Sequence, residues 1–177
     1  MRTIEKYVEK RQYILKNMFP PMICSILKEI PCINRYCGSK NFFITGDVYT
    51  GKTIKASLIA EQILIQNYLH SPNSMSFCFF NWSDIYLLSL DEQKKTIENC
   101  IKTDILFIDD LAVSGISDWL YNSLYQIINN RLLYEKITII TSNSDLEKLE
   151  KIFQDSRICS RIERHYELLK LTKSYRK

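Results

Sequence analysis

The string Gly46-Asp47-Val48-Tyr49-Thr50-Gly51-Lys52-Thr53 constrains the fold of this chain more than any other feature. It has the form G-x-x-x-x-G-K-[ST] and lies between an apolar, strand-like segment and a helix-like segment. Its two glycines let the backbone curl so that N–H groups face a phosphate chain, and the following helix points its positive end at the same phosphates. We expect Lys52 to reach the β- and γ-phosphates and the Thr53 hydroxyl to ligate Mg²⁺. The string therefore predicts a triphosphate site built by residues 46–53 together with Ile54.

Apolar segments of strand length alternate with helical segments along most of the chain. Because these strands are apolar on both sides, the alternation indicates a parallel sheet that helices cover on both faces. We expect a three-layer α/β/α fold with a parallel five-stranded sheet and with ligands at the carboxyl ends of its strands. The strands are expected at residues 41–45, 74–79, 104–108, 137–141 and 167–171, and the helices at 52–69, 83–100 (in two pieces), 117–134, 145–153 and 156–165.

The first 40 residues have a different pattern, because they are mainly helical. A charged helix is expected over residues 4–16, and Pro20-Pro21 ends it and begins a second helix that runs to about Ile30. We therefore expect an N-terminal helical extension over residues 1–40 and a nucleotide-binding domain over residues 41–177. The net charge of +4 is concentrated as positive charge at the two ends of the chain. Basic ends suit a polyanion such as nucleic acid, and they suit solvated tails equally well.

The third expected strand ends in two carboxylates, Asp109 and Asp110. A buried apolar strand that delivers acids to its carboxyl end supplies the second half of a nucleotide site. We expect Asp109 to hold Mg²⁺, directly or through water, and Asp110 to orient or deprotonate the attacking water. The alternative is that these residues only cap the next element.

The fourth expected strand runs into Thr141-Ser142-Asn143. In the expected strand order this end lies beside the first strand, close to the γ-phosphate. An amide at Asn143 could orient the attacking water and sense hydrolysis. Alternatively, Asn143 or Ser144 caps the helix that begins near Asp145.

Three arginines, Arg157, Arg161 and Arg164, follow at spacings of four and three, which places them on one face of a helix. Asp155 and Ser156 provide its start signal. Like charges on one face repel, so we expect a polyanion or a partner's carboxylates there. An arginine can also stabilise phosphoryl-transfer charge in trans, whereas the plainer alternative is a solvated basic face.

With GDVYTGKT, LFIDD, IITSN, RICSRI and a final SYR in this order, the chain resembles the AAA+ ATPases of the bacterial helicase-loader group (DnaC/DnaI-like). It is also similar to the related IstB-type transposition ATPases. The resemblance covers residues 40–177 and implies an AAA+ core without a separate lid domain, with ATP and Mg²⁺ as cofactors. It implies that Asn143 is the first sensor, that Arg157 is an arginine finger offered to a neighbouring subunit with Arg161 in support, and that Arg176 sits where a second sensor lies. Asp110 stands where Glu is commoner, which predicts slow hydrolysis.

These features favour an ATP-hydrolysing assembly switch that acts in DNA replication. It would form a homo-oligomer through Arg157 and bind single-stranded DNA, a replicative helicase, or both. One alternative is a small-molecule kinase of the nucleoside or nucleotide type, in which the arginines form a lid. A second is a transposition-type AAA+ regulator, and a third is an adaptor that binds ATP without hydrolysing it.

Several classes of protein are disfavoured. The longest uncharged stretch, residues 62–83, is interrupted by polar residues, so no membrane span is expected. The first residues are too charged for a secretory signal, and the six cysteines are scattered. Only Cys32 and Cys37 form a close pair, without a second pair to complete a zinc site. We therefore expect a cytoplasmic protein with reduced thiols and no membrane partner.

Overall fold

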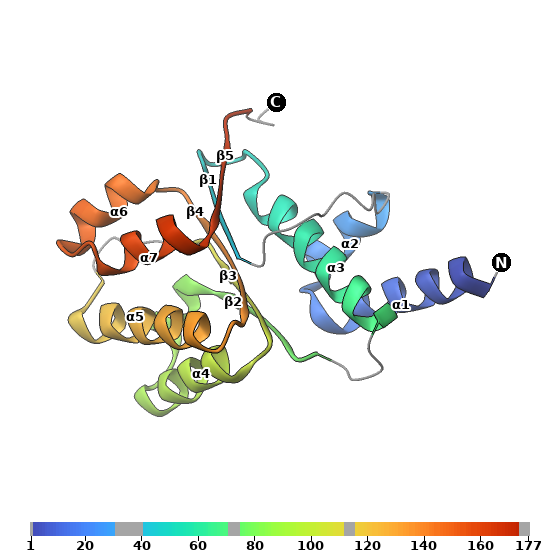
Figure 1. Ribbon diagram of the computed structural model, residues 1–177, viewed down its shortest axis with the longest axis horizontal. Helices are drawn as coiled ribbons and strands as arrows, with labels where there is room; N and C mark the ends of the chain where they lie inside the picture. The colour runs from blue at the N-terminus through green and yellow to red at the C-terminus, as the bar shows by residue number, and fades with distance from the viewer. Residues whose placement is uncertain (1, 31–40, 71–74, 112–115, 174–177) are drawn as a thin grey trace.

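A parallel five-stranded sheet with the strand order β2-β3-β4-β1-β5 forms the centre of the computed structural model, which describes residues 2–30, 41–70, 75–111 and 116–173 (Figure 1). The strands are β1 (Phe42–Gly46), β2 (Phe77–Asn81), β3 (Ile105–Asp109), β4 (Ile137–Ser142) and β5 (Glu167–Leu171). The helices are α1 (Arg2–Met18), α2 (Pro21–Glu29), α3 (Lys52–His70), the 3₁₀ helix η1 (Trp82–Leu87), α4 (Leu90–Lys102), α5 (Asp118–Leu133), α6 (Leu146–Phe153) and α7 (Arg157–His165).

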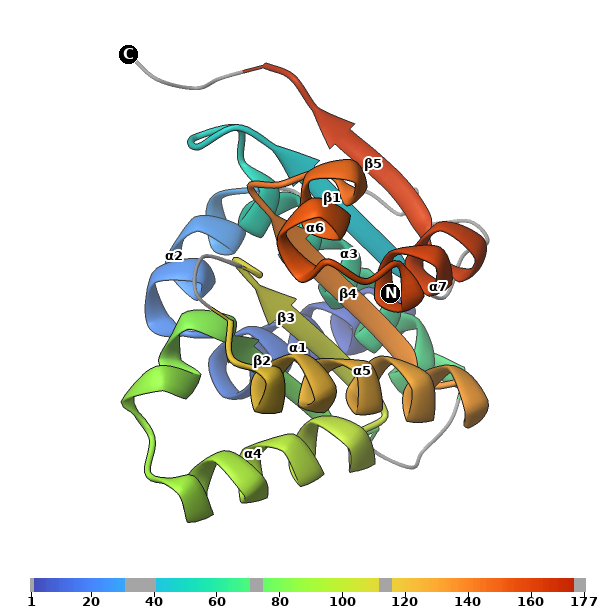
Figure 2. The same ribbon diagram turned by 90° about the vertical axis from the view of Figure 1, so that its left-hand side faces the viewer.

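Helices cover both faces of the sheet, which makes the three layers. One face is covered by α4, α5, α6 and α7, as Figure 2 shows. The other is covered by α3, with α1 and α2 packed against α3 and α1 also in contact with β2 (Figure 1). Alternate residues of each strand supply the two cores. In β3, for example, Leu106 and Ile108 pack toward α4–α7, whereas Ile105 and Phe107 pack toward α3. The predicted three-layer α/β/α fold with a parallel five-stranded sheet is confirmed.

The strand register sets the position of the site. β1 lies between β4 and β5, and the ends of all three strands come together at one edge of the sheet: Thr45 is paired with Ser142 and with Lys170. On the other side of β4, the register of β3 and β2 places Asp109 beside Asn81. The ends of these strands therefore form one continuous surface, as expected for a parallel sheet.

The helix α3 is buried on both sides, which explains why its sequence is apolar nearly all round. Its inner side contacts the sheet and its outer side contacts α1 and α2, in a cluster that includes Ile14, Leu27 and Leu64. A helix enclosed in this way needs no solvent-facing polar stripe. The two N-terminal helices thus share a hydrophobic core with the sheet; the expected boundary at residue 40 lies in the range 31–40, outside the described residues.

Most expected elements occur within one or two residues of their predicted bounds. The largest difference is in β2, whose predicted range is 74–79 and which covers Phe77–Asn81. The reason is a side-chain clamp at its start: the carboxylate of Asp104 accepts hydrogen bonds from the backbone N–H and the hydroxyl of Ser76. The predicted division of residues 83–100 into two pieces is also found, as η1 and α4.

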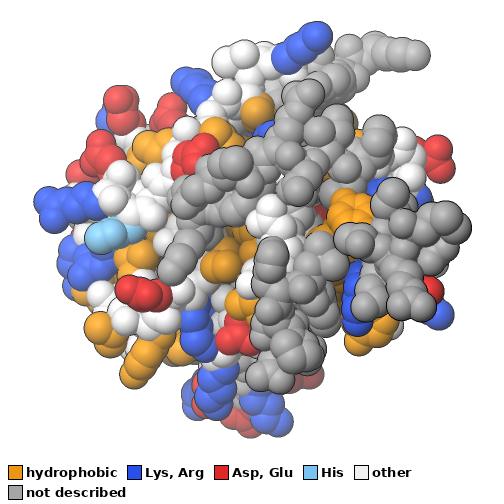
Figure 3. Space-filling view, turned by 45° about the vertical axis from the view of Figure 1, so that its right-hand side comes forward, with side chains coloured by type: hydrophobic (Ala, Val, Ile, Leu, Met, Phe, Trp, Pro, Cys, Tyr) orange, Lys and Arg blue, Asp and Glu red, His pale blue; other side chains and the backbone are white. Residues whose placement is uncertain are grey.

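Charged side chains of both signs are interspersed on the described part of the surface that Figure 3 presents, with hydrophobic side chains between them. None of the helices among the described residues is long and apolar enough to cross a membrane. The described cysteines, Cys24, Cys78, Cys100 and Cys159, are free thiols. Cys32 and Cys37 lie outside the described residues, and within those residues no three His, Cys, Asp or Glu side chains gather as a metal cluster.

Candidate nucleotide-binding site

The loop between β1 and α3 has a backbone that only glycine fits at its first position. Gly46 has φ +154°, and a Cβ placed on it would lie 2.3 Å from the carbonyl oxygen of Leu171. Gly51 and Tyr49 also have positive φ, at 80° and 67°. Within the loop, the hydroxyl of Thr50 donates to the carbonyl of Asp47 at 2.8 Å. The loop therefore has the tight curl that the sequence predicts.

Lys52 begins α3 and points back into this loop. Its side chain is largely buried, and its Nζ donates to the carbonyl oxygen of Asp47 at 2.8 Å. Burial lowers the pKa of the Lys52 amine, while the negative charges of Asp110, Asp109 and Asp47 partly offset this effect. The amine is thus held inside the curl of the loop by one of the loop's own carbonyl groups.

Asp109, the last residue of β3, meets α3 through Thr53. The Thr53 hydroxyl donates to Asp109 Oδ1 at 2.9 Å, and the Thr141 hydroxyl donates to the same oxygen at 2.7 Å. Burial raises the pKa of Asp109 and the charge of Asp110 adds to this, whereas the two hydroxyl donors act in the opposite direction. Hydroxyl and carboxylate oxygens are the donors that Mg²⁺ prefers, so Thr53 and Asp109 fit that ion.

Asp110 follows with a positive φ of 49°, which turns its carboxylate away from the strand direction. The side chain of Asn143 donates to Asp110 Oδ1 at 2.7 Å, and the backbone N–H of Asp110 donates to Thr141 Oγ1 at 2.8 Å. Asn143 therefore lies at the site, as the sequence predicts. Thr141 links both acids to β4, a role that no motif indicates because it depends on the register of β3 against β4.

A cavity of about 330 Å³ connects these groups. The loop before α3, the Thr53 hydroxyl and the carboxylates of Asp109 and Asp110 all border this one cavity. The cavity is lined by Val48, Tyr49, Gly51, Lys52, Thr53, Ile54, Asn81, Asp109, Asp110, Thr141 and Asn143. Asn81 is not among the predicted site residues; it reaches the cavity because β2 ends beside Asp109.

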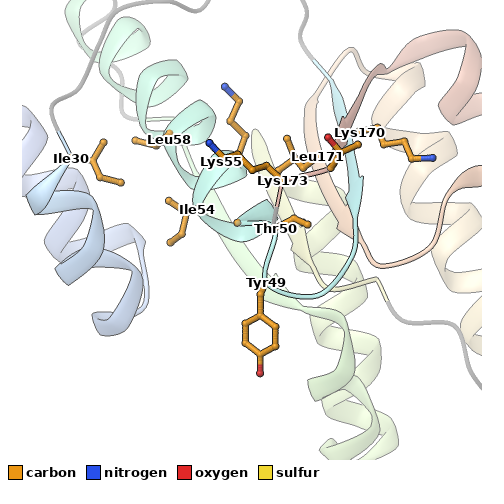
Figure 4. Close-up of a pocket in the computed structure, with 11 residues that line it drawn as sticks. Ile30, Tyr49, Thr50, Ile54, Lys55, Leu58, Lys170, Leu171 and Lys173 are labelled. Atoms are coloured by element: carbon orange, nitrogen blue, oxygen red, sulfur yellow. The ribbon is translucent and has the colours of Figure 1, made fainter. Parts of the chain in front are cut away.

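A second cavity of about 770 Å³ lies on the other side of the loop and is mostly apolar. Figure 4 shows Ile30 at the end of α2 facing Ile54 and Leu58 of α3, with the end of β5 completing the wall. Tyr49, Thr50 and Gly51 border this cavity, and Tyr49, Gly51 and Ile54 border the first one as well. The two cavities therefore meet at the loop, as the two ends of one elongated ligand would require. Sequence patterns could not identify the second cavity, because three distant segments build it.

Arg157 lies outside both cavities, at the start of α7. Its guanidinium pairs with Asp155 at 2.7 Å and lies 4.9 Å from the centre of the Tyr125 ring. Arg161 stacks on the same ring at 4.7 Å and donates to the Tyr125 hydroxyl at 2.9 Å. The aromatic ring and the Asp155 carboxylate explain how two arginines can share one helix face.

The remaining predicted arginines are placed differently. Arg164 is exposed on α7. Arg176 lies in residues 174–177, outside the described part of the chain, so the second-sensor assignment stays a prediction. The start signal of α7 comes from Asp155, whose carboxylate accepts from the backbone N–H of Arg157 at 2.8 Å, whereas Ser156 makes no side-chain cap.

The comparison with family models agrees with this geometry. The model of the IstB-like ATP binding protein family matches residues 4–177. The chain belongs to this family. It is thus an AAA+ protein of an ATP-binding family, and the resemblance to the helicase-loader and IstB-type group is confirmed. No curated protein sequence matches the chain.

Several solved structures share the fold. The crystal structure of DnaI is 18% identical, with 97% of this chain and 83% of that chain covered at a TM-score of 0.61. The DnaC helicase loader is 26% identical, with coverages of 85% and 86% at a TM-score of 0.52. The replication initiator DnaA bound to AMPPCP and single-stranded DNA is 19% identical, with coverages of 92% and 44% at a TM-score of 0.57.

Proposed function

We propose that this protein is a slow, assembly-dependent ATPase that acts in DNA replication as a helicase loader-like switch. ATP would hold neighbouring subunits together, the assembly would bind single-stranded DNA or a replicative helicase, and hydrolysis would release it. The observation that carries the proposal is the hydrogen bond from Thr53 to Asp109 in the cavity that Lys52 also lines. It unites the phosphate loop and the acidic strand end in one site.

The triphosphate would lie in the smaller cavity with its base in the larger, apolar one. Lys52 would exchange the carbonyl of Asp47 for phosphate oxygens, which offer it more negative charge. Thr53 and Asp109 would hold Mg²⁺, which neutralises negative charge on the phosphates when it is bound. The base would contact Ile30, Ile54 and Leu58.

Asp110 and Asn143 would act on the attacking water. Their hydrogen bond keeps one carboxylate oxygen and one amide beside each other at the edge of the cavity. A carboxylate can accept the proton of the water, and the amide can fix the direction from which the water attacks. Because Asp is one methylene shorter than Glu, we expect the carboxylate to be less well placed and turnover to be slow.

Arg157 would complete the site of a neighbouring subunit. Within its own subunit it is not among the described residues that line either cavity, and Asp155 and Tyr125 hold it at the surface of α7. A surface arginine held in one orientation is suited to act in trans on a phosphoryl group. This placement favours the assembly switch over the monomeric kinase, in which the arginines would have to close over their own site.

The partner classes come from the structural relatives. One of these is named as a helicase loader, and DnaA is bound to single-stranded DNA in its structure. We propose the same two classes of partner for this chain, in the cytoplasm. A transposition-type role is the alternative within the same family.

Light scattering tests the proposal most simply. The protein would be measured alone, with Mg²⁺ and ATP, with a non-hydrolysable ATP analogue, and with single-stranded DNA or a replicative helicase added. We expect ATP to increase the assembled mass and phosphate release to rise with protein concentration. ADP formation by a monomer that depends on a metabolite acceptor would instead support the kinase. Equal assembly with both nucleotides and no turnover would support the adaptor.

A further inference from the structure

Arg11 in α1 joins three helices through one guanidinium. Its Nε donates to Oε1 of Glu61 in α3 at 2.7 Å, and its Nη2 donates to the carbonyl oxygens of Leu27 and Ile30 at 2.7 Å each. The Glu61 side chain is fully buried and that of Arg11 is 19% exposed. An ion pair so deeply enclosed, with carbonyls as additional acceptors, fixes geometry more strongly than a surface pair.

These contacts hold the end of α2 against α1 and α3. The last carbonyls of a helix have no partner within the helix, and here the guanidinium of Arg11 supplies one. With nine residues, α2 is too short to hold its shape without tertiary contacts. Its position therefore depends on the burial of Ile23 and Leu27 and on the contacts of Arg11.

The end of α2 is also a wall of the larger cavity. Ile30, whose carbonyl Arg11 binds, faces Ile54 and Leu58 across that cavity (Figure 4). Ile54 and Leu58 belong to α3, the same helix that carries Glu61. Arg11 thus sets the distance between the two walls, because it binds one through a carbonyl and the other through a carboxylate.

We infer that Arg11 is a positioning residue for the nucleotide base, and that the helical pair α1–α2 is part of the nucleotide site. The inference rests on the proposed function, since it takes the larger cavity as the base pocket. Arg11 is not among the described residues that line the larger cavity. It would act on the base only through Ile30, which it holds opposite Ile54 and Leu58.

The test compares two ligands that differ in the base. ATP would use both cavities, whereas inorganic tripolyphosphate would use only the phosphate loop. Affinities of both would be measured by calorimetry with Mg²⁺ for the wild type, Arg11→Lys, Ile30→Ala and Lys28→Ala. Arg11→Lys keeps a positive charge for Glu61 but lacks the planar guanidinium, in which one nitrogen reaches the carboxylate while another reaches the two carbonyls. Lys28→Ala is the matched control, because Lys28 is exposed on α2 and does not line the larger cavity.

We expect Arg11→Lys and Ile30→Ala each to lower the affinity for ATP about tenfold, which is the scale of a lost apolar contact in a binding pocket. In both variants the affinity for tripolyphosphate should stay within about twofold of the wild-type value. Lys28→Ala should change the affinity for neither ligand. Unchanged ATP affinity in Arg11→Lys would overturn the inference, whatever the result for Ile30→Ala. Equal weakening of both ligands would also overturn it, because the effect would then lie in the phosphate loop or in folding.

The variant Lys52→Ala distinguishes a wrong role for Arg11 from a wrong proposed function. If Lys52→Ala loses both ligands while Arg11→Lys and Ile30→Ala behave as wild type, the nucleotide site stands and the role of Arg11 is wrong. If Lys52→Ala still binds ATP with wild-type affinity, the proposed function itself is wrong.

Discussion

Thr53 and Asp109 are 56 positions apart in the chain, and the Thr53 hydroxyl lies 2.9 Å from Asp109 Oδ1. This contact joins the start of α3 to the end of β3. It is possible because α3 packs across β1, β4 and β3, so that one helix reaches the ends of both motif-bearing strands. The two motifs recognised separately in the sequence therefore form one site.

Lys52→Ala should abolish nucleotide binding. Lys52 is the only lysine among the described residues that line the smaller cavity, so the variant removes the positive charge of its amine from the phosphate site. We expect the affinity for ATP to fall at least about a hundredfold, as for the loss of a charged hydrogen bond. Calorimetry measures this, with Lys94→Ala on the exposed side of α4 as the control. Tight ATP binding by Lys52→Ala would refute the phosphate-loop assignment.

Asp109→Asn should have opposite effects on the stability of the metal-free protein and on metal binding. Because burial raises the pKa of Asp109, the folded chain holds a proton here at a pH where the unfolded chain has lost it. The stability of the metal-free protein therefore falls as pH rises from the ordinary value of 3.8 through the raised pKa. Removing the charge should therefore raise the melting temperature of the metal-free protein at neutral pH.

The same variant should lose the stabilisation that Mg²⁺ and ATP give together. Thermal melts with and without Mg²⁺·ATP measure both effects, and Asp84→Asn in the exposed part of η1 is the control. A full Mg²⁺-dependent shift in Asp109→Asn would show that this carboxylate does not hold the metal. A lower melting temperature without metal would contradict the pKa argument.

Asp110→Asn should keep ATP binding and lose hydrolysis. The amide can still bind Asn143 but cannot accept a proton from water, and loss of a general base costs about 10²–10⁴ in rate. Phosphate release under saturating ATP measures the rate, and calorimetry checks that affinity stays within about twofold. Asn143→Ala should lower turnover without loss of affinity. Turnover near the wild-type rate in Asp110→Asn would assign the base elsewhere.

Arg157→Ala should bind ATP as a monomer and lose assembly-dependent turnover, by about 10³ for an arginine that acts in trans. A mixture with Lys52→Ala tests the direction of the effect. Lys52→Ala subunits cannot bind ATP but still carry Arg157, so they should restore hydrolysis by Arg157→Ala subunits. Arg164→Ala is the control, because Arg164 is exposed on the same helix. Wild-type turnover in Arg157→Ala would exclude the trans role.

The strand positions and half of the site could be predicted because they depend on local sequence. The conformation of the loop from Gly46 to Thr53 depends on glycines and a lysine within the loop itself. A strand that ends in Asp109 places this carboxylate at the carboxyl end of the sheet whichever strands lie beside it. Of the order β2-β3-β4-β1-β5, the sequence analysis predicts only that β4 lies beside β1. The start of β2 was less predictable, since the clamp between Ser76 and Asp104 joins residues 28 positions apart.

The rest of the site depends on register and packing, which single residues do not encode. Thr141 reaches both acids only because β3 and β4 pair as they do. The larger cavity combines the ends of α2 and β5 with α3. Tyr125 lies in α5, 32 positions before Arg157, so no helical spacing could have indicated that their side chains stack.

The central claim is that one triphosphate and its Mg²⁺ join the loop before α3 to the acids at the end of β3. A crystal structure with Mg²⁺ and a non-hydrolysable ATP analogue tests it most directly. We expect the metal about 2.1 Å from Thr53 Oγ1, with Asp109 in its first or second coordination sphere. Lys52 Nζ should have moved from the carbonyl of Asp47 to the phosphates. An analogue bound away from this loop, or a metal remote from Asp109, would contradict the claim.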